Sequence, residues 1–554
     1  MENTDVNQEI GTAGTAPRYV AVPLKKEDTE YTKRMKQNFG FFGPVTFLYA
    51  CLYAFCMFHN GSGVTFPFFM AGSLLFLCFS LSKLEISLKK GSAFYMVGMM
   101  LLAVSTFCTD DGRIIAYNKT GIFLLMMSLL LKQFFDTSRW QLGKYLAAIC
   151  ELVFASIGEL GRPFADMAAY FKNHKDKQLG KVWYGVLGVV IAMPLLLVVL
   201  LLLSSADAVF REMTRTFLEN LNLANIFNVI VRIVFLYFAS YLLTAYLCKR
   251  SIKEEVTDKR KGEPVLAITI TGMLSVLYLL FSGIQIVYLF LGQMQLPEGY
   301  TYAEYAREGF FQLLAVSILN LIIVLVAMSL FKESKVLKLV LTVMSFCTFI
   351  MIASSALRMI IYIRYYYMTF LRILVLWALV LLFFLFLGVV ISIFSGKFGL
   401  FRYSVAVVTV LYLLLSFSHP DYIIAAVNVA NASSEGTDFV RGEDDFFQNS
   451  EPYRDFSYLS RLSADAAPVL IPYMAGLGYD IDVFAEEIGG DRSIVVAETE
   501  KRNDGERISR SKQSGFGYYY LDSLKESTEN FSLRTFNVSR YMALKQIAKY
   551  KTGL

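Results

Sequence analysis

Long apolar runs alternate with short polar connectors along most of this chain. A helix that crosses a membrane needs about 20 mainly apolar residues, and runs of that kind predict eleven spans. They lie near residues 41–58, 64–81, 92–108, 114–131, 182–203, 226–248, 265–291, 309–331, 338–357, 371–395 and 403–418. We therefore expect an all-α polytopic membrane bundle of about 11 transmembrane helices.

One further apolar stretch, near residues 140–160, does not have the pattern of a span. Its apolar residues recur at helical spacing, but Lys144, Glu151 and Glu159 interrupt every run of twenty. This pattern is typical of an amphipathic helix that lies in the headgroup plane. We expect an interfacial cytoplasmic helix here.

The basic residues predict how the chain is oriented, because short loops keep Lys and Arg on the cytoplasmic side. These residues concentrate in the arm at 1–39 and in the loops 82–91, 132–181 and 249–263. All four segments fall on one side of the membrane if the N-terminus is inside. The arm is polar and mixed in charge, so we expect it to be disordered.

The composition changes after the last predicted span. We expect a transmembrane domain at 40–418 and a mostly helical extracytoplasmic C-terminal domain at 419–554. Within it, "LSADAAPVLIPYMAGLG" offers Ser463 as a helix cap and glycines at the helix end. The closing segment "NVSRYMALKQIAKYK" has the pattern of an amphipathic helix.

Composition narrows the classes of protein and partner. Hydrophobic residues make up 56% of the chain and charged residues 18%, which is typical of a multi-pass membrane protein in contact with the lipid bilayer. The net charge of +6 includes no basic stripe interleaved with stacking aromatics, so nucleic acid is not an expected partner. Seven cysteines without a CxxC pair, and three histidines, predict neither a disulfide framework nor a metal site, and we expect no cofactor.

Ionisable side chains gather at the predicted outer ends of spans five to eleven. A charge at membrane depth costs about 2.5–3.5 kcal/mol, so such groups are expected to face a watery cavity or one another. We predict an outward-facing polar pocket lined by Asp207, Arg232, Glu304, Arg307, Glu308, Gln312, Arg358, Arg372, His419 and Asp421. The alternative is that these residues only cap helices and anchor them in the interface.

The acids Asp110 and Asp111 form a second candidate, in a short predicted outer loop. Paired acids in such a loop resemble those of multi-pass glycosyltransferases that use lipid-linked sugars. A hydrated turn with an Asp-Gly step is the commoner cause of this spelling. No Walker loop, GxGxxG turn, GxSxG elbow or HExxH motif accompanies them, and we expect no catalytic centre.

Several motifs in order resemble one bacterial family of multi-pass membrane proteins. They are "TYAEYAREGFFQLLAVSILN", "ALRMIIYIRYYYMTFLRILVLW", "HPDYIIAAVNVANA", "YLSRLSADAAPVL" and "FNVSRYMALK". Together they are similar to domain of unknown function 4173, to which family 4153 is related. The chain departs from that pattern at Tyr367 and Met368, where a Gly-Leu pair is expected.

The resemblance implies a bacterial cytoplasmic-membrane protein with an external C-terminal domain, and it supplies no established activity. It also implies that the motif residues Glu304, Arg307, Arg358, Arg372, His419 and Asp421 belong to one shared feature.

From the number of spans and the predicted pocket, we expect transport or export of a small or lipid-like solute. The alternatives are an envelope sensor or regulatory scaffold, which would bind an envelope component, and a membrane-embedded glycosyltransferase.

Overall fold

The computed structural model is built from helices, and the parts of it that are described include no β-strand beyond an isolated bridge between Gly262 and Phe331. It describes residues 28–137, 140, 142–173, 192, 195–196, 199, 202–203, 205–207, 210, 223–249, 260–287, 302–395, 398–434, 458–476, 481, 507–528 and 532–551.

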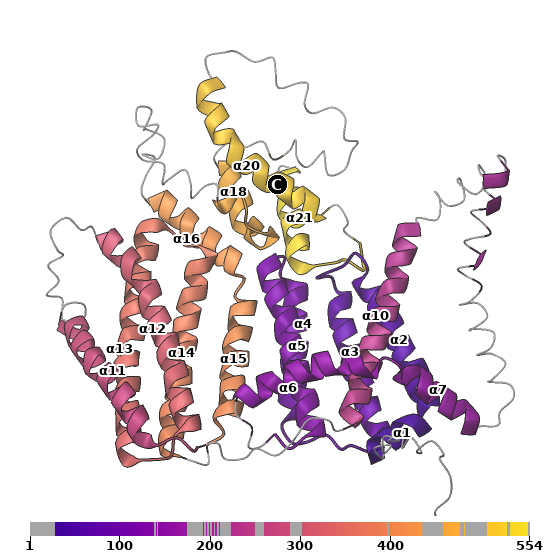
Figure 1. Cartoon of the computed structure of the whole chain (residues 1–554). Helices are drawn as coiled ribbons and strands as arrows, with labels where there is room; N and C mark the ends of the chain where they lie inside the picture. The colour runs from indigo at the N-terminus through magenta and orange to yellow at the C-terminus, as the bar shows by residue number, and fades with distance from the viewer. Residues whose placement is uncertain are drawn as a thin grey trace, which may run out of the picture.

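The N-terminal part of the chain forms a first group of packed helices (Figure 1). It comprises α1 (Glu30–Gln37), α2 (Phe39–Met57), α3 (Thr65–Lys83), α4 (Ser92–Cys108), α5 (Gly112–Phe134), α6 (Leu142–Ala155), η1 (Ser156–Glu159), α7 (Arg162–Asn173) and α10 (Leu223–Cys248). Their shared core includes Phe39 of α2, Met99 of α4 and Tyr241 of α10, each at most 3% exposed. This close packing brings α10 against α2, far from it in sequence.

A second group contains α11 (Pro264–Gln285), α12 (Tyr302–Leu330), α13 (Lys335–Tyr366) and α14 (Phe370–Phe394). Pro264 stands at the start of α11, where its missing N–H costs no helical hydrogen bond. The next helix, α15 (Leu400–Phe417), packs against α14 on one side and α4 on the other. It therefore joins the two groups.

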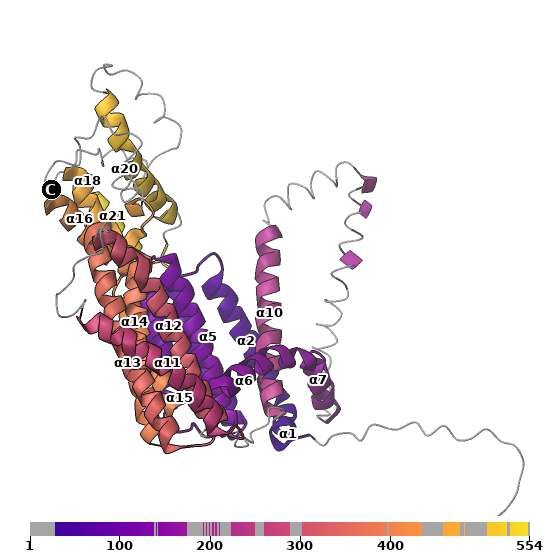
Figure 2. The ribbon, with the colours of Figure 1, turned by 60° about the vertical axis from the view of Figure 1, so that its left-hand side comes forward.

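The C-terminal helices are α16 (Pro420–Ser434), η4 (Ala464–Ala466), α18 (Ala467–Gly476), α20 (Arg507–Thr528) and α21 (Val538–Lys551). Figures 1 and 2 show them gathered at one end of the long helices. Their buried core includes Ile471 and Tyr520, and it extends onto Ile114 of α5 and Phe370 of α14. The same apolar cluster thus rests on both helix groups. The helices expected after Ser463 and at the end of the chain are present as η4 with α18 and as α21.

Nine helices within the described ranges are long and apolar enough to cross a membrane, and α4 is a slightly shorter apolar helix. Each corresponds to a span predicted from the sequence, with ends that differ by a few residues at most sites. The predicted span at 182–203 lies mostly outside the described residues. The expectation of an all-helical, multi-span architecture is confirmed; the count of eleven stays a prediction.

The predicted arm needs a correction, because its last part is folded. Residues 30–37 form α1, in which Thr32 and Met35 are 1% exposed. The Thr29 hydroxyl donates to the carbonyl of Cys248 at the end of α10, at 2.5 Å. Packing against α7 and α10 supplies the stability that the polar composition of this segment did not indicate.

Helix α6 lies across the long helices rather than along them (Figures 1 and 2). Its inward side buries Tyr145, Ala148 and Leu152, while Leu146 and Phe154 are 53% and 71% exposed. The next helix, α7, is held to α10 by Asp166, which accepts a hydrogen bond from the Tyr241 hydroxyl at 3.1 Å. The interfacial placement of α6 stays a prediction.

The turn between α13 and α14 is strained at one residue. Tyr367 has φ +64° and ψ 175°, a region that residues with a Cβ rarely adopt. The side-chain amide of Asn428 on α16 makes two hydrogen bonds to the backbone of the next residue, Met368. Its oxygen accepts from the Met368 amide at 2.7 Å, and its nitrogen donates to the Met368 carbonyl at 2.9 Å. The glycine expected here from the family pattern would relieve this strain.

Candidate functional site

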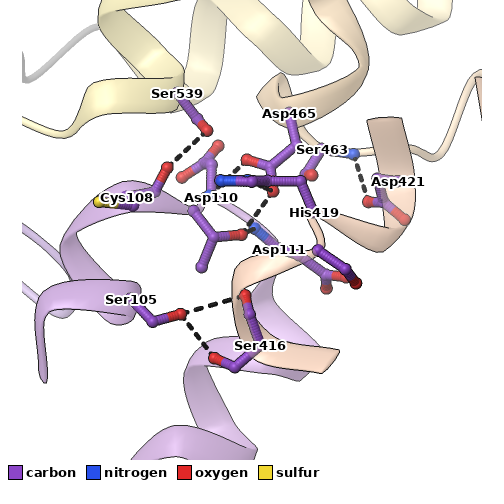
Figure 3. Close-up of polar contacts among 12 residues, drawn as sticks. Ser105, Cys108, Asp110, Asp111, Ser416, His419, Asp421, Ser463, Asp465 and Ser539 are labelled. Atoms are coloured by element: carbon purple, nitrogen blue, oxygen red, sulfur yellow. Dashed lines mark hydrogen bonds and ion pairs between the residues drawn. The ribbon is translucent and has the colours of Figure 1, made fainter. Parts of the chain in front are cut away.

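A charged junction with buried carboxylates and partly exposed bases holds the C-terminal helices against the ends of the long helices. It contains Asp110, Asp111, Arg113, His419, Asp421, Asp465 and Arg540, and we call it the outer junction. Figure 3 shows its four acids and His419. Four segments supply these residues: the α4–α5 loop, the α15–α16 corner, the start of η4 and the start of α21.

The α4–α5 loop builds the first part of the junction. Asp111 caps α5, and its carboxylate accepts from the Arg113 backbone amide and from the Arg113 side chain, each at 2.9 Å. The same guanidinium pairs with Asp421 in the first turn of α16. Arg113 also lies over the Phe370 ring, 4.0 Å from its centre. One side chain therefore connects α5, α14 and α16.

Asp465 is the central acceptor of the junction. Its side chain is completely buried, and it accepts from the Thr109 hydroxyl at 2.5 Å and from the Asp110 amide at 2.8 Å. The third donor is His419 Nδ1, at 3.1 Å. Close by, the Asp421 carboxylate accepts from the Ser463 amide at 2.9 Å. The start of η4 is thus fixed to the α4–α5 loop and to α16.

The start of α21 closes the junction from the other side. Arg540 donates to the Asp110 carboxylate at 2.7 Å. The Asn537 amide donates to the carbonyls of Thr109 at 2.9 Å and Ser62 at 3.2 Å, and the Ser539 hydroxyl donates to Cys108 at 2.8 Å. These bonds join residues more than 400 positions apart in sequence.

Burial sets the acid–base properties of the junction. It raises the pKa of Asp110 to about 6, against the opposing effect of Arg540. Burial would also raise the pKa of Asp465, but the hydrogen bonds from His419, Thr109 and the Asp110 amide bring it below its ordinary value. The hydrogen bond to Asp465 raises the pKa of His419. The pKa values of Asp110 and His419 are therefore both raised in the junction.

A neutral polar cluster lies one layer deeper, between α4, α5 and α15. Asn118 is fully buried and accepts from the hydroxyls of Tyr412 and Ser416, both at 2.7 Å. It donates to Thr106 at 3.1 Å, and the Ser105 and Ser416 hydroxyls lie 2.5 Å apart (Figure 3). This Asn118 cluster is the layer of the membrane helices next to the outer junction.

The described residues among those predicted to line one pocket belong to different groups of helices. His419 and Asp421 belong to the outer junction. Arg358 is on α13 in the second helix group, whereas Arg232 is half-buried on α10 in the first. Asp207 is exposed and accepts from the Phe210 amide at 2.7 Å.

The other predicted residues belong to the second group or lie beyond the description. Arg372 donates to the Tyr367 carbonyl and stacks on Tyr362, 4.3 Å from the ring centre. Gln312 is exposed on α12. The side chains of Glu304, Arg307 and Glu308 are outside the described part of the chain.

Arg358 is nevertheless buried deep in the second group, at 8% exposure. Its guanidinium lies 3.4 Å from the side-chain oxygen of Gln285, which also accepts from Ser354 at 2.6 Å. A Cβ added at Gly309 would overlap with a nitrogen of the Arg358 guanidinium, so any larger residue there would displace the end of this side chain. Gln285 of α11, Gly309 of α12 and Arg358 of α13 therefore meet around the Arg358 guanidinium.

The interpretation of Asp110 and Asp111 as a hydrated turn is wrong. Asp111 is 2% exposed and the Asp110 side chain 7%, because the C-terminal helices cover the loop. Sequence reasoning also missed Asp465, Arg113 and Arg540. The one local sequence signal for the Asp111–Arg113 pair was the motif "TDDGR", in which the arginine follows the second acid by two residues.

Metal binding is the usual role of clustered acids, but bases separate these carboxylates. Arg113 lies between Asp111 and Asp421, and Arg540 contacts Asp110. Within the described ranges, no group of three or more His, Cys, Asp or Glu residues is arranged to hold a metal ion.

One family matches residues 96–473 of the 554, and its description is a domain of unknown function (DUF4153). The chain belongs to this family. The expected relation to family 4153 is thereby confirmed, and nothing shows membership of 4173. No curated protein and no solved structure matches the chain. The matched range of the DUF4153 protein includes the junction residues up to Asp465 and ends before Arg540. Its many apolar helices make it an integral membrane protein.

Proposed function

We propose that this DUF4153 protein is an envelope sensor or regulatory scaffold. In this proposal the C-terminal helices bind an envelope component outside a bacterial cytoplasmic membrane, and the N-terminus lies inside. The single observation that carries it is the outer junction, where buried, hydrogen-bonded charges connect the C-terminal helices to α5, α14 and α15.

Charge pairs with buried carboxylates favour a protein with two distinct states, one with the C-terminal helices docked on the long helices and one with them released. Breaking one by removing a partner is expensive, about 3–5 kcal/mol, because the other charge stays buried. A ligand that pulls Asp465 or Arg540 out of the junction must supply that energy, so the docked and released states are well separated.

A contiguous route leads from the outer junction to the other end of the molecule. Thr109 and Arg113 lie at the two ends of the α4–α5 loop, and both helices continue through the Asn118 cluster. The far end of α5 packs against α6. A displacement of residues in the outer junction would therefore change the packing of α6 and of the loop before α4.

Hydrogen exchange of the whole protein in lipid nanodiscs tests this proposal. We compare Arg540→Gln with Lys545→Gln, an exposed residue on the same helix. A sensor predicts that Arg540→Gln increases exchange in α18 and α21 and also in α6 and residues 84–91. Changes confined to the C-terminal helices would indicate a passive anchor and count against the sensor.

Transport of a small anion is the second candidate, and it rests on the second helix group. A seam of buried polar residues runs along its facing helices: Thr271, Ser275, Ser282 and Gln285 on α11, Ser317 and Asn320 on α12, and Ser345, Thr348, Ser354, Ser355 and Arg358 on α13. Small polar residues also pack membrane helices with no transport role. The buried cation Arg358 is what favours transport.

Currents across proteoliposomes on a solid-supported membrane test this candidate. Jumps of inorganic phosphate or acetate should produce a current that Arg358→Gln abolishes. Arg364→Gln, an exposed residue two turns along α13, should leave it intact. Absence of current in the unmodified protein for every anion offered would remove support for transport.

A membrane-embedded glycosyltransferase has the least support. Its acids would have to reach a donor substrate, whereas Asp110 and Asp111 are paired with Arg540 and Arg113.

A further inference from the structure

Three basic side chains from separate segments meet at the end of the molecule opposite the C-terminal helices. They are Lys89 in the loop before α4, Lys132 in the last turn of α5 and Arg402 in the first turn of α15. In Figure 1 these helix ends lie at the lower end of the molecule, where α6 crosses the long helices. We call the three residues the basic cluster.

Hydrogen bonds fix the loop that carries Lys89 against the end of α5. The buried side chain of Gln133 accepts from the Lys89 amide at 3.1 Å and donates to the Ser92 hydroxyl at 2.5 Å. The Lys89 ammonium donates to the Phe135 carbonyl at 2.8 Å. Gly91 has φ +80°, and a Cβ there would lie 2.9 Å from the Lys132 nitrogen. The loop therefore brings Lys89 and Lys132 close together.

Arg402 approaches from the third segment. Its charge and that of Lys89 both act on the Lys132 ammonium. Its charge also acts on the hydroxyls of Tyr95 and Tyr145. Lys132 lies 5.3 Å from the centre of the Tyr95 ring, and the Tyr145 ring stacks on Phe401, next to Arg402, at 3.6 Å. Two aromatic side chains thus stand among three cations.

Two acids lie close in sequence to the segments of the basic cluster. They are Asp136, whose charge acts on Tyr145, and Glu85, which pairs with Arg34 at 2.8 Å. Within the described ranges, neither Lys132 nor Arg402 forms an ion pair with a carboxylate. Like charges repel when they are brought together, and a bound anion offsets that repulsion.

Apolar side chains continue from the basic cluster over the outside of the helices. Leu88 is 50% exposed, Phe94 37%, Val97 56%, and Leu146 of α6 53%. A soluble anion would make no contact with these apolar side chains, whereas the acyl chains of a phospholipid would cover them. Basic pockets between transmembrane helices are known to hold anionic lipid headgroups.

We propose that the basic cluster binds a phosphate group, and that this phosphate is the headgroup of an anionic lipid. Lys89, Lys132 and Arg402 contact the phosphate oxygens, and the acyl chains lie along Leu88, Phe94 and Val97. The lipid joins α4, α5 and α15 at the end where the C-terminal helices do not reach.

Native mass spectrometry of the full-length protein in dodecyl maltoside tests the site. The probe is dioleoyl phosphatidylglycerol, with dioleoyl phosphatidylcholine as the neutral comparison. One phosphatidylglycerol should be retained more tightly than any phosphatidylcholine. Each cation removed should weaken retention about fivefold, so Lys132→Gln with Arg402→Gln should weaken it about 25-fold.

The matched control removes the same net charge from the same end. Lys83→Gln with Lys335→Gln changes two exposed lysines at the ends of α3 and α13. Retention that is unchanged in the Lys132–Arg402 variant, or equally weakened in the control, would overturn the proposal. If the double variant does not fold, each single variant must still show its fivefold loss.

Inorganic phosphate separates the two possible sources of the ligand. If the site takes a lipid, millimolar phosphate leaves the retained phosphatidylglycerol in place. Displacement of the lipid by phosphate at that concentration would assign the basic cluster to a soluble phosphate and refute the lipid.

Discussion

At the scale of single residues, the outer junction should respond to pH in a direction set by its raised pKa values. The folded pKa of His419 is raised, so its contribution to stability is present below pH 6.5 and is lost as pH rises through the folded value. Asp110 has a folded pKa of about 6, against an ordinary 3.8, so the folded state gains stability as pH falls through about 6. Asp465, with a lowered pKa, contributes stability that is lost only in stronger acid.

We therefore predict that the C-terminal helices are held more firmly at pH 5.5 than at pH 8. Hydrogen exchange of α18 and α21, corrected for intrinsic rates, measures this. His419→Gln should remove the part of the change above pH 6.5, and Asp110→Asn the part near pH 6. Protection that is flat between pH 5.5 and 8, or that falls with acid, would contradict the sign.

Tyr367 gives a second prediction at this scale. A residue with a Cβ at this combination of positive φ and extended ψ, which is adopted almost only by glycine, costs about 1–3 kcal/mol. Tyr367→Gly should therefore be more stable than Tyr367→Ala by about 1–3 kcal/mol, as measured by unfolding in mixed micelles. The alanine variant loses the same ring and so controls for its contacts. Equal stability of the two variants would show that the strain is absent.

At the scale of elements, α4, α5 and α15 depend on one buried amide. Asn118→Leu would leave the hydroxyls of Tyr412 and Ser416 without their acceptor, and hydrogen bonds between membrane helices contribute about 0.6–2 kcal/mol each. We expect a loss of about 1–3 kcal/mol in unfolding free energy in mixed micelles.

Asn320→Leu is the matched control for that measurement. Asn320 is also fully buried, but it makes a single side-chain bond, to Thr348 at 3.0 Å, and its oxygen accepts none among the described residues. Its replacement should cost less than 1 kcal/mol. A larger loss from Asn320→Leu than from Asn118→Leu would mean that hydrogen bonding does not determine the strength of these helix contacts.

At the scale of the whole molecule, the distribution of bases predicts which end faces the cytoplasm. The C-terminal helices should lie outside, and the start of α13 inside. In a variant without its seven cysteines, Ser523→Cys on α20 should react with a membrane-impermeant maleimide on intact cells. Lys335→Cys should react only after the membrane is opened. The reverse pattern would invert the proposed topology.

The sequence by itself determined the helical, multi-span class and, among the described residues, the positions of nine membrane-length helices and of the shorter apolar helix α4. This was possible because a chain in lipid must satisfy its backbone hydrogen bonds within each helix, so an apolar run of sufficient length specifies its own structure. The resemblance to family 4173 also put the geometry of the turn at Tyr367 in doubt, since a glycine was expected there.

Only the tertiary structure decided which charges meet. His419 and Asp421 were expected in a pocket with Arg358. Instead His419 pairs with Asp465 at the start of η4, and Asp421 pairs with Arg113 in the first turn of α5, 308 positions away. Asp110 was expected to be hydrated, yet Arg540 reaches it across 430 positions. Ion pairs depend on distances of a few ångströms between side chains, and no local pattern encodes which helix ends pack together.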